Sequence, residues 1–226
     1  MSATDLLHRR RRKEERPQEL LAAALELFVE KGFAATRIEE VALRAGVSKG
    51  TLYLYFPSKE ELLKAVINHY LSARIAEGAA QAALHAGSAS DLLRGILVEW
   101  WGRLYDSPAS GVFKLVITEV RNFPEIGEFY ARHVIAPAHQ LIGGVVQKGI
   151  ACGEFRAVDV DHAVHSLVLP LVMICLHRHS LGACVGARVG ACPDVRPDYW
   201  QLDGNTFIAQ HVGLVLDGLC LRPPAA

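Results

Sequence analysis

The sequence predicts an all-α protein of about nine helices, and three observations support this. Apolar residues recur at helical spacing along most of the chain, glycine and proline interrupt them at intervals, and strand-like alternation is missing. At 226 residues the chain can bury a sizeable core. Three segments are predicted: a basic arm without regular structure over 1–16, a helix-turn-helix head over 17–63, and a ligand-binding, dimerising helical body over 64–226.

Residues 36–61, TRIEEVALRAGVSKGTLYLYFPSKEE, predict two short helices, a tight turn between them and the start of a third helix. Thr36 and Glu39 have the spacing of a capping box, which closes the N-terminus of the first helix. Gly46 suits the positive φ that ends such a helix, and Ser48 is a good N-cap for the second. A short helix, a glycine-containing turn and another short helix form the helix-turn-helix signature.

The second of these helices, 49–56, has an outer face that suits DNA. Leu52 and Phe56 are expected to point inward, which leaves on the outside Lys49, Gly50, Thr51, Tyr53 and Tyr55. A lysine can meet a phosphate or a guanine edge, a threonine methyl can contact a thymine methyl, and tyrosine hydroxyls can donate to phosphates. The alternative is an ordinary solvated face on a small helical bundle.

The stretch AGVSKGTLYLYFPSKEELL, with LLAAALELFVEKGFAATRIEEVA before it, resembles the DNA-binding head of TetR-family transcriptional repressors over residues 17–63. The resemblance implies a two-fold dimer that binds double-stranded DNA. It also implies base and nearby backbone contacts from Lys49, Thr51 and Tyr53, and phosphate contacts from Thr36, Tyr55 and Lys59. Ser48 and Gly50 complete the predicted DNA-binding set.

The formal net charge of the chain is zero, and its distribution is only slightly uneven. Residues 1–64 carry 12 Lys and Arg against 10 Asp and Glu, while the remainder carries 12 against 14. The run Arg9–Lys13 precedes two glutamates, and such blocks are usually disordered and often contact nucleic acid. A solvated tail is the alternative. The first helix is then expected to begin near Pro17, a residue favoured at the first helical position.

Two C-terminal helices, over about 159–180 and 205–220, are apolar on more than one side. A helix that is apolar all round must be buried all round, so burial against a second copy is predicted, with burial inside one subunit as the alternative. The hydrophobic fraction of 51% is also high for a soluble monomer. The predicted dimer interface contains Leu167, Leu171, Ile174, Phe207, Ile208, Val212, Val215 and Leu219.

A ligand pocket is predicted among aromatic residues of the body. Pro137 and Pro170 lie inside expected helices and would kink them, and kinks with aromatic side chains suit a cavity. Ordinary core filling is the alternative for each residue. The ligand is expected to be small and largely apolar, and the predicted lining is Trp100, Trp101, Phe113, Arg121, Phe129, Tyr130, His133 and Met173.

Five cysteines occur without metal-like pairing, and the polar N-terminus lacks the apolar segment of a signal peptide, so reduced thiols are expected. Cys175, His177 and His179 lie close together in sequence and suggest a metal site. His165, another candidate ligand on the same helix, lies about 21 Å before His179 along the helix axis, so it could not share that site. Thiol sensing was considered for Cys152, Cys184 and Cys192. No metal and no cofactor are predicted.

The most apolar run, 163–176, is shorter than the ~20 residues of a membrane span, so a cytoplasmic bacterial protein is expected, nucleoid-associated when bound to DNA. Motifs of hydrolases, phosphate-binding loops and metalloproteases are missing, so no enzyme is expected. The predicted function is a repressor released from a pseudo-palindromic operator by a small molecule. A redox- or metal-responsive regulator, an activator, and a binding protein that has lost DNA recognition remain as alternatives. Residues 182–203 are expected to lack regular structure.

Overall fold

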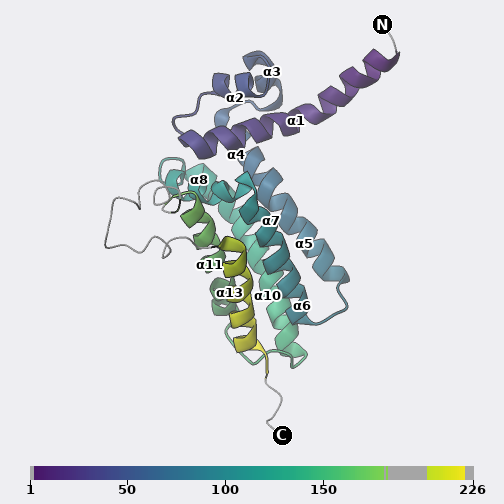
Figure 1. Cartoon of the computed structure of the whole chain (residues 1–226), viewed down its shortest axis with the longest axis vertical. Coiled ribbons are helices and arrows are strands. Elements are labelled where there is room, and N and C mark those ends of the chain that lie inside the picture. Colours follow the sequence, from purple (N-terminus) through teal and green to yellow (C-terminus); the bar gives the residue numbers. More distant parts are fainter. Residues whose placement is uncertain (1–2, 181, 183–202, 222–226) are drawn as a thin grey trace.

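The computed structural model describes residues 3–180, 182 and 203–221, with side chains from Arg16 onward. The described chain is helical, and a helical head lies at one end of a helical bundle (Figure 1). The prediction of an all-α fold with an N-terminal helix-turn-helix head is confirmed. Most of the segment expected to lack regular structure, residues 183–202, lies outside the described residues, as do Cys184 and Cys192.

The head is formed by α1 (Ala3–Lys31), α2 (Ile38–Arg44), α3 (Lys49–Tyr55) and the start of α4 (Lys59–Ile67). Its small core is completed by α4, whose apolar side chains are buried against α1. The fully buried side chains of the head and α4 include Phe28, Phe33, Leu52, Leu62 and Leu63.

The predicted start of the first helix at Pro17 is wrong, because α1 begins at Ala3 and contains Pro17. Residues 3–16 are therefore helical, where an arm without regular structure was expected. Proline removes one helical hydrogen bond, yet the residues before it are mostly Leu, Arg, Lys and Glu, which have high helix propensity.

The helix caps of the head agree with the sequence at Ser48 and Gly46 and differ at Thr36. The Ser48 hydroxyl accepts a hydrogen bond from the backbone N–H of Thr51, and the Ser58 hydroxyl accepts one from Glu61, each at 3.1 Å. Gly46 has the predicted positive φ of 65°. The predicted capping box of Thr36 and Glu39 is wrong by one residue, because Glu40 accepts the bond from the Arg37 N–H at 3.1 Å.

Three long helices of the body each contain a single π-helical turn. Helix α4 passes through η1 (Asn68–Ser72) into α5 (Ala73–Leu84), and α6 (Ala89–Arg94) passes through η2 (Gly95–Trp100) into α7 (Trp101–Asp106). Helix α9 (Pro124–Tyr130) passes through η4 (Ala131–Ile135) into α10 (Ala136–Ala151). Short π-helical turns of this kind occur often at functional sites.

The remaining body elements are the 3₁₀ turn η3 (Pro108–Ser110), α8 (Gly111–Glu119), α11 (Val160–Arg178) and α13 (Gly204–Leu219). Helix α10 packs against α5, α6 and α11, while α13 packs against α7 and α11. At the end distant from the head, Glu154 accepts hydrogen bonds from the backbone N–H groups of Ala89 and Ser90 at 2.7 and 2.8 Å. This carboxylate therefore ties the turn after α10 to the N-terminus of α6.

Helix α11 is the one described helix that is long and apolar enough to cross a membrane by length and composition. Of its most apolar 18-residue window, 33% is buried inside the subunit. Core helices of soluble proteins meet the same criterion, so this finding is weak evidence for a membrane span.

Head and body are in direct contact through α1 and α4. The C-terminal part of α1 packs on η3 and α8, and α4 packs on α9. The contact at Gly111 is close, because a Cβ atom placed there would lie 2.5 Å from a methyl carbon of Val29. Since α4 also continues through η1 into α5, the orientation of the head depends on the packing of the body.

Candidate nucleic-acid interface and ligand groove

Helix α3 presents one buried face and one exposed face. Leu52 is fully buried and anchors the helix to the head. On the opposite face, Lys49, Gly50 and Tyr53 are exposed, as the sequence predicted, while Tyr55 is only half-exposed and packs against the core. The helix can therefore approach another molecule with three of the predicted residues at the front.

Leu54 was missed by the sequence analysis, although it is 84% exposed on α3. Helical spacing would have found it, because Leu54 is four residues after Gly50 and two after the buried Leu52. Sequence reasoning passed over it because a leucine in an amphipathic helix is ordinarily assigned to the core.

The Ser48 and Thr51 side chains hold each other at the start of α3. Besides accepting the Thr51 N–H, the Ser48 hydroxyl lies 2.9 Å from the Thr51 hydroxyl. Ser48 is exposed and Thr51 is half-buried. Both hydroxyls can still bond an incoming oxygen, but their rotamers are already restricted before any ligand arrives.

Lys49 forms an ion pair with Glu39 of α2, with 2.6 Å between the lysine nitrogen and the carboxylate oxygen. Its ammonium group also lies 5.8 Å from the centre of the Tyr53 ring. The hydrogen bond between the two side chains is the main cause of both pKa shifts: it raises the pKa of Lys49 and lowers that of Glu39. In the free protein the ammonium group at the front of α3 is therefore paired with a carboxylate.

Other cations of the described part of the head are paired in the same way. Lys31 contacts Glu40 at 2.7 Å, and Arg44 makes two hydrogen bonds to the carboxylate of Glu30, at 3.0 and 3.1 Å. These pairs join α1 to α2 across the surface of the head.

Thr36 does not have the phosphate-binding role that the resemblance implied. Its side chain is 1% exposed, and its hydroxyl donates to the carbonyl oxygens of Gly32 at 2.7 Å and Leu27 at 3.2 Å. The hydroxyl therefore bonds the Gly32 carbonyl just after α1 and the Leu27 carbonyl in the last turns of α1, which fixes Thr36 against the end of this helix.

The same correction applies to Lys59. Its ammonium group donates to the carbonyl oxygens of Phe33, Ala34 and Thr36 at 2.9 to 3.2 Å. It also lies 4.5 Å from the centre of the Phe33 ring. All three ammonium protons are engaged, so Lys59 fixes the turn between α1 and α2 and has no free donor for a phosphate.

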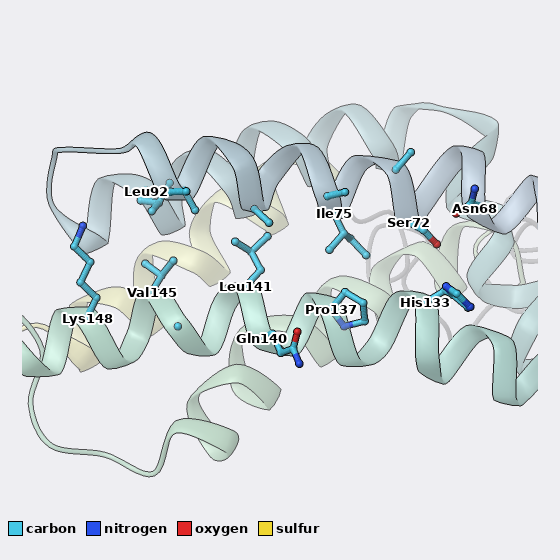
Figure 2. A pocket seen from close by; sticks show the side chains of 16 residues that line it. Asn68, Ser72, Ile75, Leu92, His133, Pro137, Gln140, Leu141, Val145 and Lys148 are labelled. Carbon is cyan, nitrogen blue, oxygen red and sulfur yellow. The ribbon is translucent and has the colours of Figure 1, made fainter.

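A pocket in the described part of the body lies elsewhere than predicted. It is a groove of about 730 Å³ between η1–α5 on one side and η4–α10 on the other. Figure 2 shows its length, with Lys148 at one end and Asn68 and His133 at the other. Of the eight predicted pocket residues, His133 alone lines this groove.

The other predicted pocket residues have different surroundings. Trp101 and Phe113 are buried and stack at 5.4 Å, so they fill the core, and Phe129 stacks on His133 at 4.3 Å. Burial raises the pKa of Tyr130. The remaining predictions are half-buried or exposed residues outside the groove: Trp100, Arg121 and Met173.

The comparisons with known proteins agree with this geometry. Residues 20–66 match the family described as "Bacterial regulatory proteins, tetR family", and residues 91–183 match "AefR-like transcriptional repressor, C-terminal domain". The uncharacterized HTH-type transcriptional regulator YfiR of Bacillus subtilis is 30% identical over 150 residues, which cover 65% of this chain and 71% of that protein. The chain belongs to the TetR family.

Other matches are confined to the head or show the fold alone. The regulator YuxN of Bacillus subtilis is 43% identical over 56 residues, 25% of this chain, and the match spans 19% of the length of YuxN. Matches of this kind span about a fifth to a quarter of the length of the curated relatives. A TetR-family regulator from Mesorhizobium loti has the same fold, with a TM-score of 0.64, 20% identity and coverage of 93% of this chain and 99% of that one.

The predicted dimer residues of this TetR-family chain are mostly inside the subunit. Six of the eight are buried: Leu167, Leu171, Ile174, Ile208, Val212 and Leu219. The prediction is wrong for these six, because α11 and α13 use these side chains to pack on the body's own core; Phe207 and Val215 are half-buried. The exposed large apolar residues of the two helices are Leu169, Met173 and Leu214.

The cysteine and histidine residues of the TetR-family body have ordinary packing partners. Cys175 is buried, and burial raises the pKa of its thiol to about 12, which disfavours the reactive thiolate. The ring of His179 lies 2.7 Å from the Ser110 hydroxyl, and burial lowers its pKa. Within the described residues no group of three or more metal-binding side chains is assembled. Cys152 is exposed, without a described ion-pair partner.

Proposed function

We propose that this chain is a dimeric transcriptional repressor that binds a pseudo-palindromic operator and leaves it when a small molecule binds the body. The observation that carries the proposal is the outer face of α3, where Lys49, Tyr53 and Leu54 are exposed on a helix anchored by Leu52. Such a face at the second helix of a helix-turn-helix unit suits the major groove. The role is non-catalytic and is exercised in the cytoplasm.

The contacts proposed on DNA follow from the chemistry of each side chain. Lys49 exchanges Glu39 for a phosphate or a guanine edge, and the Tyr53 hydroxyl donates to a phosphate. Leu54 contacts a thymine methyl group, because an exposed leucine at the front of the helix can offer only apolar contact. Four other residues lie around these three and are proposed to bond the DNA backbone: Ser48, Gly50, Thr51 and Tyr55.

Dimerisation is proposed through the exposed apolar side chains Leu169, Met173 and Leu214. They lie on α11 and α13, which pack side by side, so a second copy related by two-fold symmetry can cover the outer sides of both helices. A two-fold dimer presents two α3 helices to half-sites about one DNA turn apart, roughly 34–36 Å. Ligand binding then releases DNA by changing the separation of the heads through α4.

The experiment is selection of binding sites from a random duplex pool at physiological salt, followed by affinity measurements on the selected site. Leu54→Ala is the informative variant, and Leu84→Ala is its matched control, since Leu84 is 87% exposed at the far end of α5. We expect a pseudo-palindrome whose affinity drops roughly tenfold for Leu54→Ala, at the scale of a lost base contact, and is unchanged for Leu84→Ala. Recovery of no sequence would contradict the proposal.

A further inference from the structure

Three features of the groove between α5 and α10 together indicate what kind of ligand it binds: an open middle, an end with a lysine and an end with polar hydrogen-bonding groups. Small residues line it between its ends, with Ala76 and Ala79 on α5 and Gly144 on α10. A Cβ atom placed on Gly144 would meet no atom within 4 Å, so the middle is open. From Pro137 to Lys148 the groove runs roughly 16 Å along α10. An extended chain of about a dozen carbons has this length.

The two ends of the groove differ in charge. At the end distant from the head, Lys148 is exposed and its nitrogen lies 3.5 Å from the His85 carbonyl oxygen. Among the residues that line the groove there is no aspartate or glutamate, so the charge of Lys148 is not balanced within it. A ligand with an anionic group would therefore be attracted to this end of the groove.

Among the lining residues that the structure describes, the end close to the head carries polar groups and no acidic or lysine side chain. Asn68, Ser72 and His133 line it, and Figure 2 shows all three at this end. The Ser72 hydroxyl oxygen is buried and has no hydrogen-bond partner among the described residues. A buried polar atom is costly when it is left unbonded, so a ligand oxygen at this position would be stabilising.

Resting on the proposed function, we propose that the inducer is an elongated amphiphile that binds this groove. Its anionic group pairs with Lys148, an unbranched apolar chain lies over Ala76, Ala79 and Gly144, and a hydroxyl or carbonyl oxygen at the other end bonds Ser72. An ω-hydroxylated long-chain carboxylate has all three parts.

The same groove connects to the DNA-binding head. Asn68 and Ser72 belong to η1, and His133 belongs to η4, and these two π-helical turns contact each other. Helix α4 precedes η1 directly and has four fully buried side chains against the head and body: Leu62, Leu63, Val66 and Ile67. A ligand that separates η1 from η4 therefore moves α4 as a rigid unit, and the head with it.

The test uses the full chain and three probes: ω-hydroxydodecanoate, dodecanoate and dodecanediol, each below its micelle concentration. Calorimetry measures their binding, and the same samples are titrated with operator DNA. We expect ω-hydroxydodecanoate to bind most tightly and to weaken operator binding. Failure of all three probes to bind overturns the inference, as does binding that leaves the operator affinity unchanged.

Variants locate the site. Gly144→Leu fills the channel and should weaken binding at least tenfold, whereas Gly95→Leu, also at a position with open space but outside the groove, should leave it unchanged. Lys148→Gln should weaken binding roughly fivefold and remove the preference over dodecanediol, whereas Lys114→Gln outside the groove should not. Ser72→Ala should remove the preference over dodecanoate. Equal binding by Gly144→Leu and the unaltered chain overturns the site.

Operator binding without ligand separates the two proposals. If the ligand-free chain binds its operator and no probe binds the groove, the inference about the ligand fails while the proposed function stands. If no operator is found but the probes bind and respond to Gly144→Leu, the repressor proposal fails and the ligand site stands.

Discussion

Helices α3 and α13 divide their side chains between the core and the surface in different ways. Helix α3 has one fully buried side chain, Leu52, and its outer face carries Lys49, Tyr53 and Leu54. Helix α13 buries four large apolar residues at helical spacing and still exposes Leu214 on its other side. A short helix anchored at one point has its outer face available for recognition, whereas an apolar residue on the outer side of a core helix indicates a further partner.

The largest effect is expected where a charge replaces a core residue of α13. Ile208 is 0% exposed, so Ile208→Glu would bury an unpaired carboxylate and destabilise the subunit by more than about 4 kcal/mol. Leu214→Glu places the same charge on the outer side of the same helix and should leave the subunit folded but monomeric. Circular dichroism measures the folding and light scattering the mass; a dimeric Leu214→Glu would refute the proposed interface.

A smaller effect is expected when Lys59 is replaced. Comparison with the same replacement at Lys49 distinguishes a structural lysine from one that contacts DNA. Lys59→Met removes three hydrogen bonds to carbonyl groups and should lower the free energy of unfolding by about 2 kcal/mol. Lys49→Met, on the exposed face, should change that free energy little and weaken operator binding. Chemical denaturation and DNA titration measure the two quantities, and reversed effects would restore the phosphate-binding role to Lys59.

Thr36→Val is expected to act in the same direction with a smaller magnitude. The valine keeps the shape of the side chain but removes the donor to Leu27 and Gly32, at a cost of about 1–2 kcal/mol. Thermal unfolding should show a lower midpoint, and the salt dependence of operator binding should not change. A changed salt dependence with an unchanged midpoint would indicate that Thr36 contacts phosphate after all.

The smallest effect on stability is expected from Glu39→Gln. This variant tests DNA binding instead of folding. The variant frees Lys49 from its carboxylate partner and removes a negative charge beside the DNA. Binding to non-specific DNA should strengthen, and the slope of log affinity against log salt should steepen by about one. Filter binding over a salt series measures this; an unchanged slope would mean that the ion pair does not restrain Lys49.

The helical caps and faces of the head were largely predictable, because they depend on residues close together in sequence. Ser48 and Gly46 act where their types predicted, since each caps or ends a helix within a few residues. Thr36 and Lys59 were assigned to DNA by resemblance, but their partners lie 4 to 26 residues away and could not be identified from spacing. Leu54 was missed for the opposite reason, because apolar character was taken to mean burial.

Local order in the sequence determined the all-α class, the helix-turn-helix head and the exposed position of Lys49 and Tyr53. Only the tertiary structure decided which side of α11 and α13 faces the core, and that the groove lies between α5 and α10. The physical reason is that hydrogen bonds and caps within a helix join neighbouring residues, whereas an apolar side chain can be buried against any apolar surface. Its partner is chosen when distant helices pack together.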